Sequence, residues 1–344
     1  MTLSDLKPPA VGEWVEYSDD LRTLLLYGGP ITEPVRAGGR QGWDDFELLS
    51  TERALGEADE LREAATAVQL VPGLPVDRAA AELVDGAASG RLVALGGGRV
   101  IDSAKAVASV TRADVAAIPT TLSGAPITGF HRLPAGRESE VSGFVRPSLV
   151  IAYADAMTSL PEPELRATAM NALAHGADSL YTPLADPISR ATALRGAELI
   201  AGALDQAPDR RDSSALATGA LLCAIAVDRA GFALHHVLGQ TTVRVLGIPH
   251  AETYAALLPH TTGAMRARAP EQIEALAEAL GTDPGGIAER IDELAGRRRI
   301  GELGADRGRI DEVVAGAMSR SELQQMTPGE VRRSDLEGIL EAAW

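Results

Sequence analysis

The sequence predicts an α/β N-terminal domain with a parallel sheet, followed by an all-α C-terminal domain. Short apolar runs alternate with helical patterns through the first part of the chain, which is typical of strand–helix–strand units. From about Pro161 the pattern changes to long Ala- and Leu-rich helices with few β-branched runs. We therefore expect an α/β domain over residues 1–155 and a helical domain over residues 156–344.

The predicted strands are short apolar runs bounded by turn residues. They cover residues 23–27, 46–49, 68–72, 92–95, 115–118 and 149–152. Helical spacing predicts helices over 52–67 and 76–86, with a loop at 38–42. Residues 127–145, including His131, are expected to form a hairpin. In an open parallel sheet, ligands bind at the carboxyl ends of the strands.

One of these strands runs directly into three consecutive glycines, Gly96, Gly97 and Gly98, which are followed by a helical pattern. Glycines let the backbone turn tightly and let a ligand approach the main chain. The free N–H groups and the dipole of the following helix favour an anion, so phosphate or pyrophosphate is the expected ligand. The pattern is not the G-x-G-x-x-G fingerprint, and a merely tight connection is the alternative.

The composition excludes several classes of protein. A net charge of −16 and a pI near 4.9 argue against a nucleic-acid or anionic-membrane partner. The single cysteine, Cys223, lies in an apolar run and cannot form an internal disulfide, which suits a reducing compartment. We expect no signal peptide and no stretch apolar for long enough to span a bilayer. We therefore expect a soluble cytoplasmic protein with a small-molecule partner.

The second half of the chain is predicted to be helical throughout. The expected helices cover residues 163–181, 187–204, 214–238, 270–280, 284–294, 309–318 and 334–344. Asn171 and His175 lie four residues apart on the first of them and so share a face. His236, with its neighbour His235, is expected near the end of a later helix, and His250 opens the element after it. Together these residues could bind a metal ion or a substrate carbonyl. A single histidine on a helix face, however, is more often an ordinary core or surface residue.

With these motifs in view, the chain resembles the iron-containing alcohol dehydrogenase superfamily, and most closely the maleylacetate reductases, whose fold is dehydroquinate synthase-like. The resemblance covers nearly the whole chain. Its carriers are Gly96-Gly97-Gly98 with Asp102 and Ala104-Lys105, Ile118-Pro119-Thr120-Thr121, Met170-Asn171-Ala172-Leu173-Ala174-His175, His236-Val237-Leu238-Gly239, Pro249-His250-Ala251-Glu252-Thr253 and Leu258-Pro259-His260.

The resemblance implies a nucleotide-binding N-terminal domain, a helical C-terminal domain and a catalytic cleft between them. It implies NADH or NADPH as cofactor, with the residues Gly96, Gly97, Gly98, Arg99, Asp102, Thr120 and Thr121 around it. It also implies a homodimer.

In metal-dependent relatives an Asp and three His hold the ion, and those positions resemble Asn171, His175, His236 and His250 here. A neutral amide is a poor ligand for a divalent ion and supplies no negative charge. Maleylacetate reductases are similar in carrying Asn at this position. The resemblance therefore implies that this enzyme catalyses its reaction without a metal ion. The resemblance then assigns the histidines to the substrate, with one imidazolium protonating its oxygen as hydride arrives. If a metal binds at all, its ligands would be His175, His236 and His250.

Several positions depart from the family pattern. Arg99 replaces the serine after the glycines, and it either clamps a cofactor phosphate or occupies the place of that phosphate. Gly124-Ala125-Pro126 replaces a Gly-Ser-Glu sequence. Tyr254 stands where the family has a further histidine, and Gly231-Phe232 replaces a His-His pair. The pocket is therefore expected to differ from that of an ordinary maleylacetate reductase.

We therefore predict an NAD(P)H-dependent, metal-independent reductase of a small carbonyl or enone substrate. His175, His236, His250, Asn171 and Tyr254 would surround the substrate, with His250 or His236 as proton donor. The alternative is a non-redox cyclase, lyase or dehydratase of a specialised biosynthetic pathway, using the histidines for acid–base chemistry. A catalytically silent partner subunit is the third interpretation.

Overall fold

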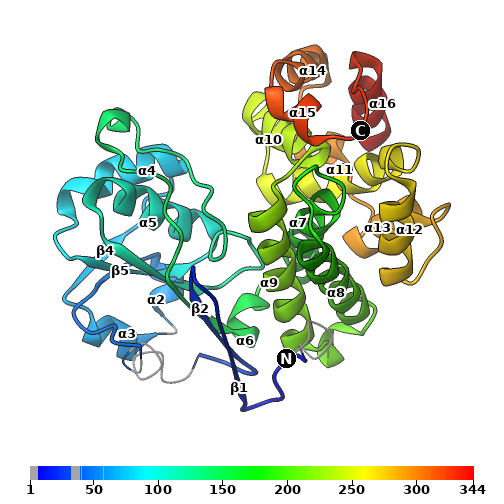
Figure 1. The fold of residues 1–344 in the computed structure, drawn as a ribbon. Helices are drawn as coiled ribbons and strands as arrows, with labels where there is room; N and C mark the ends of the chain where they lie inside the picture. The colour runs from blue at the N-terminus through cyan, green and yellow to red at the C-terminus, as the bar shows by residue number, and fades with distance from the viewer. Residues whose placement is uncertain (1–6, 32–38, 40, 57) are drawn as a thin grey trace. The chain divides into compact units, whose positions relative to one another are not determined.

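The computed structural model describes residues 7–31, 39, 41–56 and 58–344 (Figure 1). The described chain divides into two compact units, Lys7–Ser159 and Leu160–Trp344. The first is an α/β unit built on one sheet, and the second is helical. The fold class expected from the sequence is therefore confirmed. The loop predicted at residues 38–42 lies partly outside the described residues.

The described strands of the first unit form a seven-stranded sheet in the order β1-β2-β7-β6-β5-β3-β4. They are β1 (Trp14–Ser18), β2 (Thr23–Tyr27), β3 (Glu47–Ser50), β4 (Ala67–Leu70), β5 (Arg91–Gly96), β6 (Asp114–Pro119) and β7 (Leu149–Tyr153). Neighbouring strands run parallel, except that β1 pairs antiparallel with β2. The edge strand β1 was not predicted, because it contains no fully buried residue and so has no apolar run.

Alternate residues of the central strands belong to two apolar cores. Leu92 and Ala94 of β5 pack with residues of α4 (Val76–Leu83) and α5 (Gly98–Thr111). Val93 and Leu95 belong to the other core, which includes Leu61 of α3 (Asp59–Ala64). Because successive side chains of a strand point to opposite faces, helices cover both sides of the sheet, as predicted.

Two predictions in the first unit are wrong. The single helix expected over residues 52–67 is broken into α2 (Glu52–Leu55) and α3, and β4 already begins at Ala67. The segment 127–145 contains no strand and only a short 3₁₀ helix at Glu138–Glu140.

Residues 127–145 are held in place by side-chain hydrogen bonds and not by the strand pairing that a hairpin would have. The buried Lys105 Nζ donates to the carbonyl oxygens of Ala125 (3.2 Å) and Phe130 (2.7 Å). The backbone N–H of Val145 donates to Nε2 of His131 (3.0 Å). These contacts satisfy main-chain groups that a hairpin would have paired with each other.

The second unit contains the long helices of the protein. They are α7 (Glu162–Ser179), α8 (Pro187–Leu204), α9 (Ser213–Ala230), α10 (Leu234–Leu246), α11 (His250–Met265), α12 (Pro270–Ala279), α13 (Ile287–Ala295), α14 (Ile310–Met318), α15 (Ser321–Met326) and α16 (Arg333–Ala343). The helix predicted over 214–238 is in fact two helices. Gly231, at φ 73°, ends α9, so His235 and His236 lie at the start of α10 and not near the end of a helix.

Helices α8 and α9 approach each other closely through small residues. A Cβ added at Gly196 would lie 2.6 Å from Cys223 Sγ and 2.8 Å from the carbonyl oxygen of Gly219. Helix α9 is long and apolar enough to cross a membrane by length and composition, which our sequence analysis did not expect. However, 78% of it is buried inside the protein, as is common for a core helix.

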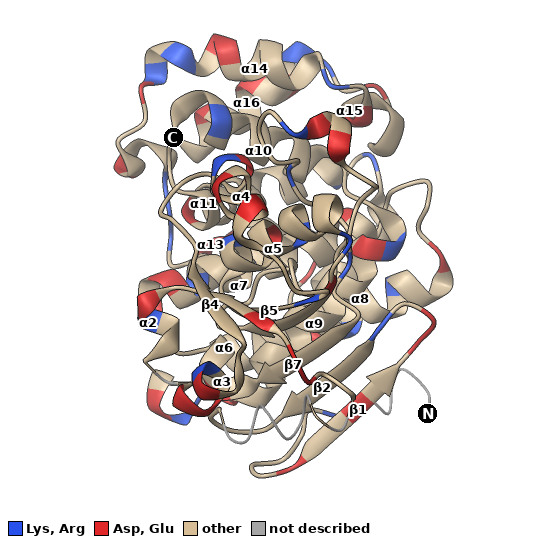
Figure 2. Cartoon of the chain, turned by 90° about the vertical axis from the view of Figure 1, so that its left-hand side faces the viewer, with Lys and Arg blue, Asp and Glu red and all other residues tan. Residues whose placement is uncertain are grey.

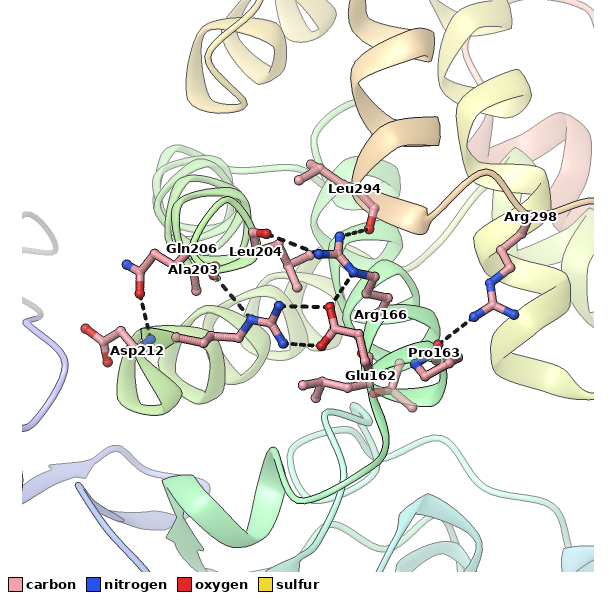
Figure 3. Close-up of polar contacts among 12 residues, drawn as sticks. Glu162, Pro163, Arg166, Ala203, Leu204, Gln206, Asp212, Leu294 and Arg298 are labelled. Carbon is pink, nitrogen blue, oxygen red and sulfur yellow. Dashed lines mark hydrogen bonds and ion pairs between the residues drawn. The ribbon is translucent and has the colours of Figure 1, made fainter. Parts of the chain in front are cut away.

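A cluster of charges ties the N-terminal end of α7 to α8, to α13 and to the segment before α9 (Figure 3). Both carboxylate oxygens of Glu162 accept hydrogen bonds from Arg211, at 2.5 and 2.9 Å, and Oε1 also accepts from Arg166 (2.6 Å). Arg166 in turn donates to the carbonyl oxygens of Leu204 and Leu294, at the ends of α8 and α13. The cluster therefore satisfies helix-end carbonyls that would otherwise lack a partner.

Elsewhere on the second unit, acidic residues of α14 and α15 lie near arginines of the adjoining segments (Figure 2). Arg309 pairs with Glu312 (2.8 Å) and Arg333 with Asp311 (2.6 Å). Exposed pairs of this kind contribute little to stability.

Candidate active site

In the α/β unit, the glycine turn joins β5 to α5 as predicted. The glycines allow the segment after β6 to lie against the turn. A Cβ at Gly98 would lie 2.6 Å from Ser123 Oγ, and one at Gly97 would lie 3.1 Å from Thr121 Cγ2. The close packing of these two segments therefore explains why Gly97 and Gly98 are glycines, even without a bound ligand.

The start of α5 nevertheless fits an anion. Gly97 is the N-cap and supplies no side-chain hydrogen bond, and the first turn of the helix contains no acidic residue. The N-terminal amides and the helix dipole therefore favour a phosphate here. Arg99 is exposed on this first turn, and its Nη1 would lie 3.8 Å from a Cβ added at Gly73, which follows β4.

The other residues predicted to bind the cofactor lie close to this turn. Thr120 follows β6, and its N–H donates to the carbonyl oxygen of Gly96 (3.0 Å). Thr120 and Thr121 are both partly exposed. Asp102 differs from them, because its carboxylate accepts a hydrogen bond from the buried Lys105 (2.7 Å). Its assignment to the cofactor remains a prediction.

In the helical unit, the structure brings the predicted site residues of α7, α10 and α11 together. The ring centroids of His175 and His236 lie 4.9 Å apart, and the two rings stack with an interplanar angle of 20°. Tyr254 lies edge-on to His236 (5.3 Å) and stacks on His250 (4.2 Å). His235 also contacts Tyr254 (5.1 Å), so the sequence-predicted set forms one ring cluster.

Asn171 lies one turn before His175 on α7 and is 7% exposed. Its Oδ1 is a buried atom without a hydrogen-bond partner among the described residues. The same holds for His175 Nδ1 and His236 Nε2. Buried polar atoms are almost always paired in folded proteins, so three such atoms in one cluster indicate a place for a polar ligand.

The central residue of the cluster, Asp178, was not predicted from the sequence. This fully buried carboxylate lies three residues after His175 on α7. Its Oδ2 accepts a hydrogen bond from His236 Nδ1 (2.8 Å) and from the backbone N–H groups of Ala233 (2.9 Å) and His236 (3.1 Å). The spacing His-x-x-Asp on a predicted helix was the available signal, but an acidic residue at one helical position usually faces solvent.

Burial governs the protonation of the ring cluster. Burial, and then the neighbouring histidines, hold the pKa of His175 well below its ordinary value. The same causes lower the pKa of His235 to about 3, so both rings are neutral near pH 7. Burial also raises the pKa of the Tyr254 phenol.

The pKa of Asp178 is determined by two opposing effects. Burial alone would raise its pKa, but the hydrogen bond from His236 and the nearby imidazoles lower it below its ordinary value. The carboxylate is therefore ionised, and it provides the one negative charge among the buried groups named above.

One member of the donor set argues against a bound divalent metal. Asn171 stands where metal-binding relatives are expected to have a carboxylate. Across the residues that the structure describes, no group of three His, Cys, Asp or Glu side chains is arranged to hold a metal ion.

The structure thus combines an α/β unit, whose glycine turn fits an anion, with a helical unit that contains a cluster of buried histidines. Residues 166–344 match the model of the Fe-containing alcohol dehydrogenase family, C-terminal, and residues 51–130 match that of iron-containing alcohol dehydrogenase. The chain therefore belongs to the iron-containing alcohol dehydrogenase family and is an oxidoreductase.

Several relatives carry a more specific name. A maleylacetate reductase of Rhodococcus opacus is 30% identical over 261 residues, which cover 74% of this chain and 72% of the relative. A maleylacetate reductase of Rhizobium sp. strain MTP-10005 is 30% identical over 296 residues, covering 80% and 83%.

Solved structures agree with these sequence relatives. The crystal structure of maleylacetate reductase from the same Rhizobium strain has a TM-score of 0.81 at 26% identity, covering 96% of this chain and 98% of that one. An iron-containing alcohol dehydrogenase from Corynebacterium glutamicum has a TM-score of 0.78 at 28% identity, covering 90% of each chain.

Proposed function

We propose that this oxidoreductase is an NAD(P)H-dependent, metal-independent reductase of a small carbonyl or enone substrate. The observation that carries the proposal is the buried His236, whose Nδ1 is bonded to Asp178 while Nε2 has no partner among the described residues. An imidazole held in this way is suited to deliver a proton. The maleylacetate reductase relatives support a redox reaction and do not favour the non-redox alternative.

Residues 1–155 would bind the dinucleotide and residues 156–344 the substrate. The first-turn amides of α5 and the exposed Arg99 are suited to the pyrophosphate, or to a 2′-phosphate in NADPH. Thr120 and Thr121 offer hydroxyl groups beside the same turn. When bound, a reduced nicotinamide supplies the hydride.

The ring cluster would perform the acid–base half of the reaction. The carbonyl carbon would receive the hydride from a bound nicotinamide. The substrate oxygen would take the proton from Nε2 of protonated His236, which would leave that ring neutral and the substrate as the alcohol. Asn171, His175, His250 and Tyr254 would surround the substrate, and no metal takes part in any step.

The protein would act on a small molecule in the cytoplasm as a homodimer. The single cysteine, Cys223, is free and buried, which suits a reducing compartment and supports this location. The dimer rests on family resemblance alone, and size measurement of the purified protein in solution tests it.

Calorimetric titration with NADH and then NADPH tests the cofactor assignment. We expect micromolar binding of at least one of them, followed by oxidation of that cofactor in the presence of keto acids, aldehydes or quinone-like carbonyls. The His236→Gln variant should keep cofactor binding and lose about 100- to 10,000-fold in kcat, the usual range for removing a general acid. If neither dinucleotide binds the wild-type protein, the proposal is overturned and the non-redox alternative becomes the better account.

A further inference from the structure

The carboxylate of Asp178 connects α7 to the start of α10. Its Oδ2 accepts from the N–H groups of Ala233 and His236 and from His236 Nδ1, at 2.9, 3.1 and 2.8 Å. Its Oδ1 accepts from the His235 N–H (3.3 Å) and from the Tyr181 hydroxyl. Three of these partners are backbone N–H groups, which can only donate, and the pKa of Asp178 lies below its ordinary value, so the carboxylate is ionised and acts only as an acceptor.

This arrangement determines which nitrogen of His236 carries a proton. Because a carboxylate can only accept, Nδ1 of His236 must be protonated to bond to it. In the neutral ring Nε2 is then the basic nitrogen, and it is the one that has no partner among the described residues. Stacking against His175 at 4.9 Å restricts rotation of the ring about its bond to Cβ.

We propose that Asp178 is a positioning residue, which holds His236 as the Nδ1–H tautomer and directs Nε2 to the substrate oxygen. This inference rests on the proposed reductase function, and it adds a residue outside the set predicted from the sequence. Tyr181, one turn further along the chain, bonds to the other oxygen and holds the carboxylate in the required orientation.

A purely structural role for Asp178 is the competing explanation, because the same carboxylate caps the N-terminal end of α10. The two roles differ in what they predict for the ring. A cap is needed for the helix to begin at Leu234, but it places no demand on the tautomer of His236. The decisive readouts are therefore the tautomer and the separation of kcat from KM.

The first measurement uses the wild-type holoenzyme. Nitrogen NMR of histidine-labelled protein, with the His236 signals assigned by their loss in His236→Gln, reports which ring nitrogen carries the proton. We expect a protonated Nδ1 and an unprotonated Nε2 in the neutral ring. The opposite tautomer would overturn the role of Asp178, whether or not the protein proves to be a reductase.

The second measurement compares Asp178→Asn with Asp212→Asn. Asp212 also caps a helix, accepting from the Ala215 N–H (2.9 Å) at the start of α9, but no histidine bond is among its contacts. We expect Asp178→Asn to lower kcat about 10- to 100-fold, the usual effect of removing a histidine's supporting partner, with KM and dinucleotide affinity nearly unchanged. Asp212→Asn should leave kcat unchanged.

The outcomes separate this inference from the proposed function. If wild-type protein reduces no carbonyl, the function fails, while the tautomer measurement still decides the role of Asp178. If wild-type protein is a reductase and Asp178→Asn, folded by circular dichroism, keeps its full kcat, the positioning role is overturned and the reductase proposal stands.

Discussion

The imidazoles of His175 and His236 stack face to face, with centroids 4.9 Å apart and an angle of 20° between the ring planes. Two protonated rings at this distance would repel each other strongly. Burial, and then the neighbouring histidines, hold the pKa of His175 well below its ordinary value, so this ring is neutral near pH 7 and the pair avoids that repulsion.

The neutral amide of Asn171, where metal-binding relatives are expected to have a carboxylate, leads to a prediction about metals. We expect purified protein to contain far less than one equivalent of iron or zinc, and dialysis against a chelator to leave its reductase activity unchanged. Elemental analysis of the active protein, before and after chelation, checks this. Activity that disappears with the metal and returns with added Fe²⁺ or Zn²⁺ would contradict it.

The close approach of α8 and α9 predicts opposite effects for two substitutions in one helix. Gly196→Ala adds a Cβ 2.6 Å from Cys223 Sγ, and overpacking of this kind costs about 1 to 3 kcal/mol of the free energy of unfolding. Gly202→Ala, also in α8, has nothing within 4 Å of the new Cβ and should stabilise by about 0.5 to 1 kcal/mol. Chemical denaturation of both variants measures the two values. Equal effects would show that the helices are packed differently.

Arg99 can be tested by its effect on cofactor binding. If its guanidinium binds a phosphate of the dinucleotide, Arg99→Ala should weaken the binding of NADH or NADPH about tenfold, as expected for a lost charge-assisted hydrogen bond. Arg62→Ala, at an exposed position of α3, removes the same charge and is the matched control. Tighter binding by Arg99→Ala in calorimetry would instead mean that the side chain blocks the phosphate site.

The Glu162 cluster predicts a pH-dependent contribution to stability. The hydrogen bonds from Arg211, and then from Arg166, lower the pKa of Glu162 below its ordinary value of 4.5, despite the opposing effect of partial burial. A lowered carboxyl pKa means that the stabilisation is fully present above pH 4.5 and is lost as the pH falls through the folded-state value.

Glu162→Gln should therefore lower the melting temperature at neutral pH, and the difference from wild type should shrink in acid. Glu198→Gln is the control, because Glu198 pairs with Arg195 on an exposed surface of α8 and should have little effect. Thermal denaturation of both variants at neutral and acid pH checks this. A Glu162→Gln difference that stays constant with pH would contradict the assignment.

The sheet could be predicted from sequence because its central strands are continuous apolar runs. β2 was placed correctly at Thr23–Tyr27, and the turn after β5 was found from its glycines. The hairpin expected over 127–145 was wrong because the segment is held by Lys105 and His131 side chains, and contacts between distant residues leave no periodic pattern.

The candidate site could be predicted only in part. The histidines were found from their spacing and the family resemblance, and the structure brings them together in one ring cluster. Gly231 was read as a helix-interior residue, so the start of α10 was missed, and with it the helix end that Asp178 caps. A capping interaction between different helices depends on tertiary structure, which local sequence does not encode.

The sparse aromatic residues give the two units separate optical signals. Of the three tryptophans, Trp14 and Trp43 belong to the α/β unit, and Trp344 ends the helical unit, where the Arg307 guanidinium lies 5.8 Å from the centre of its ring. Trp14 also lies 4.8 Å from Tyr27, in β2. In a Trp344→Phe variant, tryptophan emission would come from the α/β unit alone, so the unfolding of that unit can be followed without labels while circular dichroism follows the helices.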